Sequence, residues 1–107
     1  MPFEPTDDPV SPNVAITHSE ANNKGRYEVR FGAGTEPAEL TYTRKGPHTI
    51  IANHTFVPDA LRGRGIAEAL VRRLVADARK GDYRIVPLCP YVKALYEKHP
   101  EWSDVMR

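Results

Sequence analysis

Hydrophobic and polar residues alternate along two segments in the first half of the chain. In residues 26–31 apolar and charged side chains alternate without exception, and the same period of two recurs from Ala38 to Arg44. This period predicts strands with one buried face. A short apolar run, Val14–Thr17, predicts a further strand before them. We expect an antiparallel meander, because turn-forming residues separate the strands. These turns are predicted at residues 19–25, 32–37 and 45–47.

The next segment, Thr49–Val57, carries apolar residues at both odd and even positions. A strand of this kind is typically covered on both faces, so the pattern predicts a central strand. Its even positions place His54 on one face with Ile50, Ala52 and Phe56, because successive side chains of a strand point to opposite faces.

After Pro58 the hydrophobic period changes to that of a helix. A set of apolar residues follows the i, i+3, i+4, i+7 rule and predicts one buried stripe. Its members are Ala67, Leu70, Val71, Leu74, Val75 and Ala78. Gly81 is suited to end this helix, since glycine is the residue that most readily adopts the left-handed conformation found after helices.

A further strand is predicted at Arg84–Leu88, within which Pro87 cannot donate a ladder hydrogen bond. Pro90 suits the first position of a second helix, with Cys89 near the N-cap, and Pro100 marks the end of that helix. The residues on one face of this helix are Val92, Leu95, Tyr96 and His99.

Length and composition predict one domain, residues 13–107, preceded by a proline-rich, disordered arm, residues 1–12. The single cysteine suits a reducing compartment, and the acidic arm does not resemble a signal peptide, so we expect a cytoplasmic protein without membrane association. The net charge is +1, and removing the arm's three carboxylates leaves +4. This mild surplus suits a small anionic ligand better than a nucleic acid.

The turn Arg62-Gly63-Arg64-Gly65 lies between the predicted central strand and the first helix. The first amides of a helix lack intrahelical acceptors, and glycine lets a phosphate approach them, so this turn predicts an anion cradle to which Arg62 and Arg64 add charge. The spacing matches neither a Walker loop nor a dinucleotide fingerprint. The alternative is an ordinary surface turn.

The string Arg62-x-x-Gly65-x-Ala67 resembles the pyrophosphate-binding turn of the GNAT superfamily, the acetyl-CoA-dependent N-acetyltransferases. Three further strings resemble segments of its small single-domain members, in the same order along the chain: His54–Val57, Pro87–Val92 and Lys98–Trp102. Ala94–Lys98 is also similar to a segment that follows the fifth strand in many members. The resemblance implies an α+β fold, a mostly antiparallel mixed sheet of about five strands with two helices.

The resemblance also implies acetyl-CoA as the cofactor. The pyrophosphate would lie on the turn and the first residues of the helix: Arg62, Gly63, Arg64, Gly65, Ile66 and Ala67. The fourth and fifth strands would diverge around the pantetheine arm. The backbone of Phe56 or Val57 would then bind the pantetheine and the oxyanion of the reaction.

Three side chains are candidates for catalysis, and two of them also lie where the cofactor would bind. Cys89, in a Pro-x-Cys-Pro string, is a candidate nucleophile or proton donor at a helix N-terminus. By resemblance, Tyr96 matches the tyrosine that protonates the leaving thiolate. His54 is a candidate general base. The alternatives are a buried core cysteine, a packed tyrosine and a core histidine.

The chain departs from larger GNAT proteins because it leaves no room for helices between its first two strands. Those helices help to wall the acceptor site, so we expect an open site for an amine acceptor, either a small molecule or a protein lysine or N-terminus. A non-catalytic CoA-binding module is the first alternative, and a nucleic-acid-binding domain using Arg62, Arg64, Arg72 and Arg73 is a weaker one. We expect a monomer or weak dimer without a metal.

Overall fold

The computed structural model describes residues 16–30, 36–59 and 65–106. The predicted arm at residues 1–12 lies outside this part of the chain. So do three residues of the predicted anion cradle, Arg62, Gly63 and Arg64.

One five-stranded mixed sheet organises the described residues, with its strands in sequence order. The strands are β1 (Ile16–Ala21), β2 (Lys24–Val29), β3 (Ala38–Arg44), β4 (Thr49–Phe56) and β5 (Arg84–Pro87). The first four are antiparallel, and β5 runs parallel to β4. The helices are α1 (Ile66–Gly81), α2 (Pro90–Lys98) and the 3₁₀ helix η2 (Pro100–Asp104). The α+β prediction is therefore confirmed.

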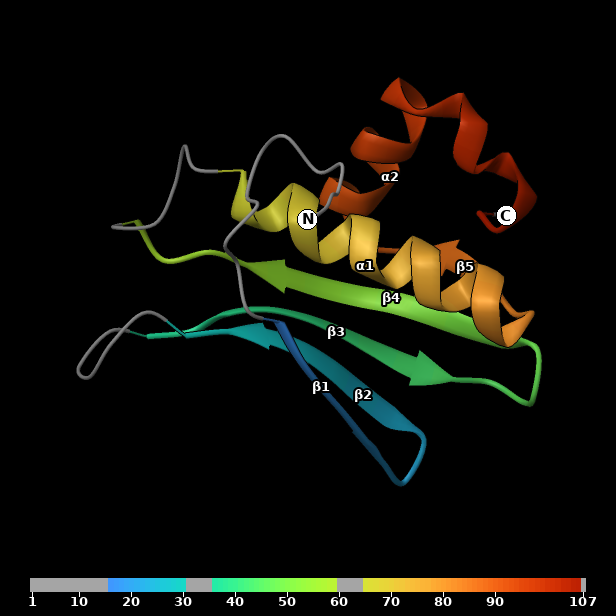
Figure 1. Cartoon of the computed structure of the whole chain (residues 1–107), viewed down its shortest axis with the longest axis horizontal. Helices are drawn as coiled ribbons and strands as arrows, with labels where there is room; N and C mark the ends of the chain where they lie inside the picture. The colour runs from blue at the N-terminus through green and yellow to red at the C-terminus, as the bar shows by residue number, and fades with distance from the viewer. Residues whose placement is uncertain (1–15, 31–35, 60–64, 107) are drawn as a thin grey trace, which may run out of the picture.

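The helices lie on one side of the sheet and leave its other face open (Figure 1). The prediction that the fourth strand is covered on both faces is therefore wrong. Ile50 and Ala52 are fully buried beneath the helices, whereas Asn53, His54 and Phe56 are exposed. An antiparallel sheet tolerates this arrangement, since only one of its faces must be packed on a core.

A β-bulge at Asn53 interrupts the period of two in β4. Tyr42 of β3 lies opposite Ala52, but Thr41, the residue before it, lies opposite His54, so Asn53 is the extra residue. An inserted residue exchanges the faces to which all later side chains of the strand point.

The exchange decides to which face each of the last three residues of β4 points. Thr55 stands opposite the buried Leu40 and therefore faces the helices. His54 and Phe56 face the open side. The prediction that His54 shares a face with Ile50 and Ala52 is wrong, because the pattern of apolar residues does not reveal the bulge.

The first hairpin turns at Asn22 and Asn23, both with positive φ (55° and 65°). Asparagine tolerates this conformation better than most residues, and two such residues fit the twist of a β-hairpin. The polar segment at 19–25 is therefore mostly strand, and the prediction of a broad turn is wrong. Of the remaining predicted strands, Ala38–Arg44 has the bounds of β3.

Helix α1 packs its apolar stripe across β2 and β3. Leu70, Val71, Leu74, Val75 and Ala78 are buried as predicted. The stripe begins one residue before the predicted Ala67, which is only half-buried, and uses Ile66 and Ala69 instead. The helix ends at Gly81, and Asp82 is the left-handed capping residue whose N–H bonds the carbonyl of Ala78. Among the described helices none is long and apolar enough to span a membrane.

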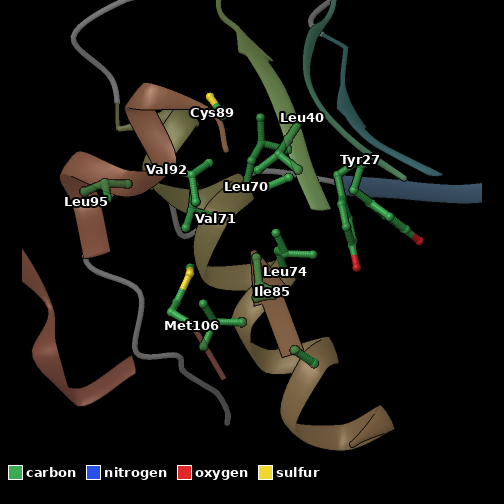
Figure 2. Packing of buried hydrophobic residues seen from close by; sticks show 14 of the residues in the cluster. Tyr27, Leu40, Leu70, Val71, Leu74, Ile85, Cys89, Val92, Leu95 and Met106 are labelled. Carbon is green, nitrogen blue, oxygen red and sulfur yellow. The ribbon is translucent and has the colours of Figure 1, made fainter. Parts of the chain in front are cut away.

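The sequence after α2 adds to the core, which the hydrophobic pattern did not indicate. Trp102, Val105 and Met106 are buried, and Met106 forms a bridge with Ile85 of β5. Figure 2 shows Met106 and Ile85 among the buried hydrophobic side chains. This segment fastens the end of the chain to β5, the edge strand.

Candidate functional site

Strands β4 and β5 are paired along only part of their length. Their four pairs run from Thr49 with Arg84 to Ala52 with Pro87. After Pro87 the chain folds back on itself, because the N–H of Leu88 bonds the carbonyl of Val86 at 2.9 Å. Strand β4 continues to Phe56, and within the described residues no strand pairs with this edge beyond Ala52. The two strands therefore part where an extended ligand could add its own hydrogen bonds.

Cys89 stands at the point where the strands part. Its N–H donates to the carbonyl of Ala52 at 2.9 Å, and it is the N-cap of α2, with Pro90 as the first helical residue. Its side chain is 4% exposed, and its Sγ lies 3.5 Å from Oγ1 of Thr55. Figure 2 shows the sulfur at the start of α2. The predicted N-cap is confirmed, and the thiol lies on the helix side of the sheet.

Thr55 is a residue of this site that sequence reasoning missed. Its hydroxyl is half-buried and accepts a hydrogen bond from the Cys89 thiol. With the unbroken period of two, Thr55 belongs to the open face. Only the bulge brings it to the helix side.

His54 lies on the other face of the sheet from Cys89. It is exposed, stands opposite Thr41, and makes no side-chain hydrogen bond or ion pair with the residues that the structure describes. The three candidate catalytic residues therefore do not form one cluster. Cys89 and Tyr96 belong to the helix side, and His54 belongs to the open side.

Tyr96 follows Cys89 by seven residues, two turns along α2, and is half-buried against the core. Helical side chains lean toward the N-terminus of their helix, which is the end that Cys89 caps. Phe56 has 37% of its surface exposed on the open side, while Val57, the next residue, is half-buried and packs against the core.

The start of α1 suits an anion. Its N-cap is Gly65, in the left-handed conformation with φ 73°, and no side chain caps the helix there. The N–H of Ala69 makes the first intrahelical bond to the carbonyl of Gly65, at 3.0 Å. The N–H groups of Ile66 and Ala67 precede this bond and, by helix geometry, have no intrahelical acceptor.

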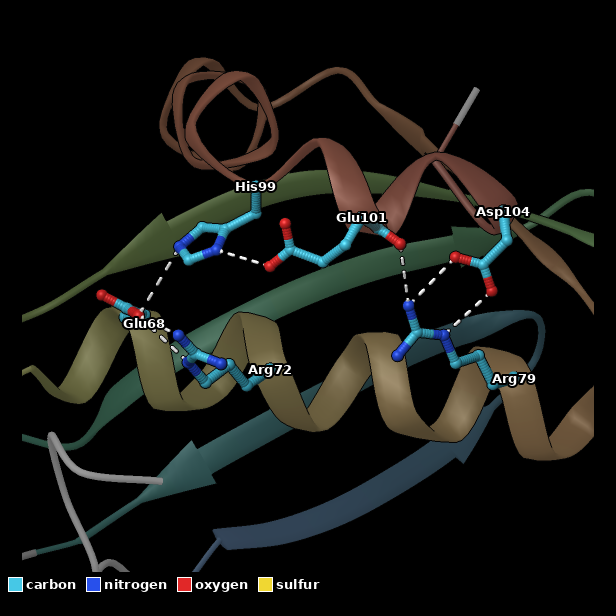
Figure 3. Close-up of polar contacts among 6 residues, drawn as sticks. All are labelled: Glu68, Arg72, Arg79, His99, Glu101 and Asp104. Carbon is cyan, nitrogen blue, oxygen red and sulfur yellow. Dashed lines mark hydrogen bonds and ion pairs between the residues drawn. The ribbon is translucent and has the colours of Figure 1, made fainter. Parts of the chain in front are cut away.

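Glu68 lies in this first helical turn, but its charge is balanced within the protein. Arg72 donates to its carboxylate at 2.7 Å, and His99 lies 3.8 Å from it. His99 in turn stacks on Trp102 with ring centroids 4.4 Å apart. Figure 3 shows the contacts of Glu68 with Arg72 and His99, together with a second link, from Arg79 of α1 to Asp104 of η2. They join α1 to the segment after α2 and keep Glu68 from opposing an anion at the helix start.

Two of the arginines considered for nucleic-acid binding are engaged within the protein. Arg72 is paired with Glu68 and lies over the Trp102 ring at 5.8 Å. Arg73 is paired with Asp77 at 3.1 Å. Within the described residues, both arginines are therefore already paired with a carboxylate of α1.

These features agree with the comparison with known families. They are the parting of β4 and β5, the glycine that begins α1 without a side-chain cap, and the cysteine between β5 and α2. The family described as GCN5-related N-acetyl-transferase matches residues 26–105. The chain belongs to this family. Its members typically bind acetyl-CoA, and the match spans β2 to the end of η2, including both strands that part.

Relatives of similar length support this membership. The chain is 29% identical to Protein NATD1 of Xenopus tropicalis over 87% of the chain and 85% of that protein. It is 31% identical to Protein NATD1 of Homo sapiens over 81% of the chain and 75% of that protein. The solution structure of a GCN5-like protein from Staphylococcus aureus is 27% identical, with a TM-score of 0.66, and the match covers 85% of this chain and 87% of that one.

Proposed function

We propose that the protein is an acetyl-CoA-dependent N-acetyltransferase that acts on a primary amine. The observation that carries this proposal is the parting of β4 and β5 after Ala52 and Pro87, beside the uncapped start of α1. An extended chain ending in a phosphate fits such a site, because the strand edge and the helix start both offer backbone groups.

The cofactor enters from the helix side in this proposal. Gly65, Ile66 and Ala67 bind its pyrophosphate through backbone N–H groups, and Arg62, Gly63 and Arg64, which lie outside the described residues, also contact it in this proposal. The backbone of Phe56, at the end of β4, and of Val57, the residue after it, binds the pantetheine arm. Cys89 lies beside the thioester, held by its contact with Thr55 at 3.5 Å.

The amine approaches from the open face, where His54 is exposed. His54 accepts the proton that the ammonium group loses, and the free amine attacks the thioester carbonyl. A backbone N–H of Phe56 or Val57 stabilises the oxyanion. As the C–N bond forms and the C–S bond breaks, the hydroxyl of Tyr96 donates a proton to the departing thiolate.

Transfer is direct in this scheme, without an acetyl group on Cys89. The support is the burial of Cys89, which is 4% exposed and whose thiol is already hydrogen-bonded to Thr55.

A non-catalytic module that binds CoA is the second candidate, and the open face of the sheet favours it. No described helix covers this face (Figure 1), so the acceptor site lacks a wall that would exclude water.

Two measurements on one preparation test the proposal. Calorimetric titration with acetyl-CoA is expected to give binding that Arg64→Glu weakens. Release of CoA in the presence of an amine panel is expected to exceed the rate without protein, and to fall with Tyr96→Phe. Binding without turnover would leave the CoA-binding module, and no binding would refute both candidates.

A further inference from the structure

We propose that Glu39 and Phe56 hold the ammonium group of a lysine side chain, presented by an extended polypeptide on the open face of the sheet. This inference rests on the proposed N-acetyltransferase function and deepens it by naming the acceptor and the residues that select it.

Glu39 and Phe56 are direct neighbours across two strands. Glu39 of β3 lies opposite Phe56 of β4, and two residues away Thr41 lies opposite His54. Residues directly opposite in an antiparallel pair have Cβ atoms about 5 Å apart. All four side chains face the open side, so a carboxylate, an aromatic ring and an imidazole lie on one small patch.

This combination suits a protonated amine. An aromatic face attracts a cation, and a carboxylate adds charge complementarity. Phe56 is one of three large apolar side chains that the described residues leave exposed, at 37%, and the Glu39 side chain is 27% exposed. The Phe56 ring is thus partly exposed beside a carboxylate, which is consistent with a binding role.

The nearby carboxylates differ in how far they are already paired. Glu28, the neighbour of Glu39 on β2, is held by Arg26 and by Arg30, each at 3.1 Å. Glu39 has one described ion pair, with the same Arg26, at 3.7 Å. Glu39 therefore retains more of its capacity to accept hydrogen bonds from an incoming cation.

The shape of the open face indicates a polypeptide rather than a small free amine. A shallow hollow of about 550 Å³ adjoins the patch at Thr41 and extends across β3 to β1. Its lining includes Ser19, Lys24, Arg26, Thr43 and Asn53. Small-molecule sites usually enclose most of their ligand, whereas this hollow is open and its surface is part polar and part apolar. It can bind the N–H and carbonyl groups of an extended segment while one lysine reaches the patch.

The patch also lies in the right place relative to the proposed acetyl donor. Strands β4 and β5 part after Ala52, and His54 and Phe56 face the open side in the part of β4 that no longer pairs with β5. An ammonium group held by Glu39 and Phe56 would be next to His54, which takes its proton before attack.

Binding to the CoA-loaded full chain is the test, measured by calorimetry with a short unstructured peptide that contains one lysine. Replacing that lysine by norleucine keeps the aliphatic part of the side chain and removes the charged amino group. We expect the norleucine peptide and the Glu39→Gln variant each to weaken binding about tenfold, and Phe56→Leu about fivefold, which are typical losses for an ion pair and a cation–π contact. Glu28→Gln is the matched control and should change the affinity less than twofold.

Three results would overturn the inference. They are equal binding of the lysine and norleucine peptides, equal losses for Glu39→Gln and Glu28→Gln, and n-butylamine binding as tightly as the lysine peptide. The last would point to a small amine. Lysine-dependent binding without acetyl transfer would instead refute the proposed function and leave the ammonium site standing. Thermal melting of each variant, with Glu39→Asp as a milder change, separates loss of the site from loss of the fold.

Discussion

The thiol of Cys89 donates a hydrogen bond to the hydroxyl of Thr55, with Sγ 3.5 Å from Oγ1. The two residues come from the start of α2 and from the end of β4, beyond its last pair with β5. Their contact therefore lies on the helix side of the point where β4 and β5 part. It also places the only cysteine of the chain where the proposed thioester would lie.

We expect Cys89→Ala to lower kcat about tenfold and Cys89→Ser to retain most of it, because serine keeps the polar contact with Thr55. Intact-protein mass spectrometry after incubation with acetyl-CoA should detect no acetyl group on Cys89. A stoichiometric adduct that an amine then removes would contradict direct transfer. Thr55→Val is the companion variant, since it leaves the thiol in place and removes only its partner.

His54→Ala should lower kcat about a hundredfold if His54 is the general base, a typical magnitude for the loss of such a group. Added imidazole should restore part of the rate, because it can diffuse to the exposed position that the side chain vacates. Affinity for acetyl-CoA should not change, since His54 faces away from the helix side. His48→Ala is a control for a histidine elsewhere, and a rate unaffected by His54→Ala would remove the residue from the mechanism.

Gly25→Ala should destabilise the fold by about 2–4 kcal/mol, as overpacking in a core does. A Cβ at Gly25 would lie 2.0 Å from Cζ of Tyr42, whose ring is buried and hydrogen-bonded to Glu20 and His18. The ring has no easy way to move aside. Gly46→Ala provides the comparison, because Gly46 has φ 112° and no neighbour within 4 Å. It should cost about 1 kcal/mol through backbone strain alone. Equal costs in urea unfolding would show that Tyr42 can give way.

Glu20 makes the stability sensitive to acid. Hydrogen bonds from Arg44, and then from Tyr42, lower the pKa of its carboxyl from 4.5 to about 2. Because the pKa is lower in the folded state, the ionised carboxylate stabilises the fold at pH values above the pKa of the unfolded chain. This contribution is lost as the pH falls from about 4.5 towards 2. Glu20→Gln should therefore cost about 1–2 kcal/mol at pH 7 and less at pH 3.5. Urea unfolding at both pH values, with the exposed Glu97→Gln as the control, measures the difference. A cost independent of pH would contradict this assignment.

The order of the elements followed from local patterns. The alternation in β3 and the helical stripe of α1 each report burial on one face, and Pro90 after Cys89 reports a helix start. These features depend on nearby residues alone, so their positions were predicted closely. The first hairpin was predicted less well, because two asparagines at positive φ make a tighter turn than the polar segment indicated.

The assignment of site residues to faces could not be predicted in the same way. The bulge at Asn53 depends on how β4 aligns with β3, a long-range relationship that no local period records. Thr55 was therefore missed, and His54 was assigned to the wrong face. The burial of Trp102 and Met106 is likewise a tertiary effect, since that segment has no hydrophobic period of its own.

The bulge has a consequence for comparing this chain with its relatives. In a protein that lacks the extra residue, an alignment without a gap would match His54, Thr55 and Phe56 to side chains on the opposite faces of the strand. Such an alignment would equate residues that face different sides of the sheet. Functional residues of β4 are better matched between relatives by the residue of β3 that lies opposite each of them. In this chain Thr41 lies opposite His54, and Leu40 lies opposite Thr55.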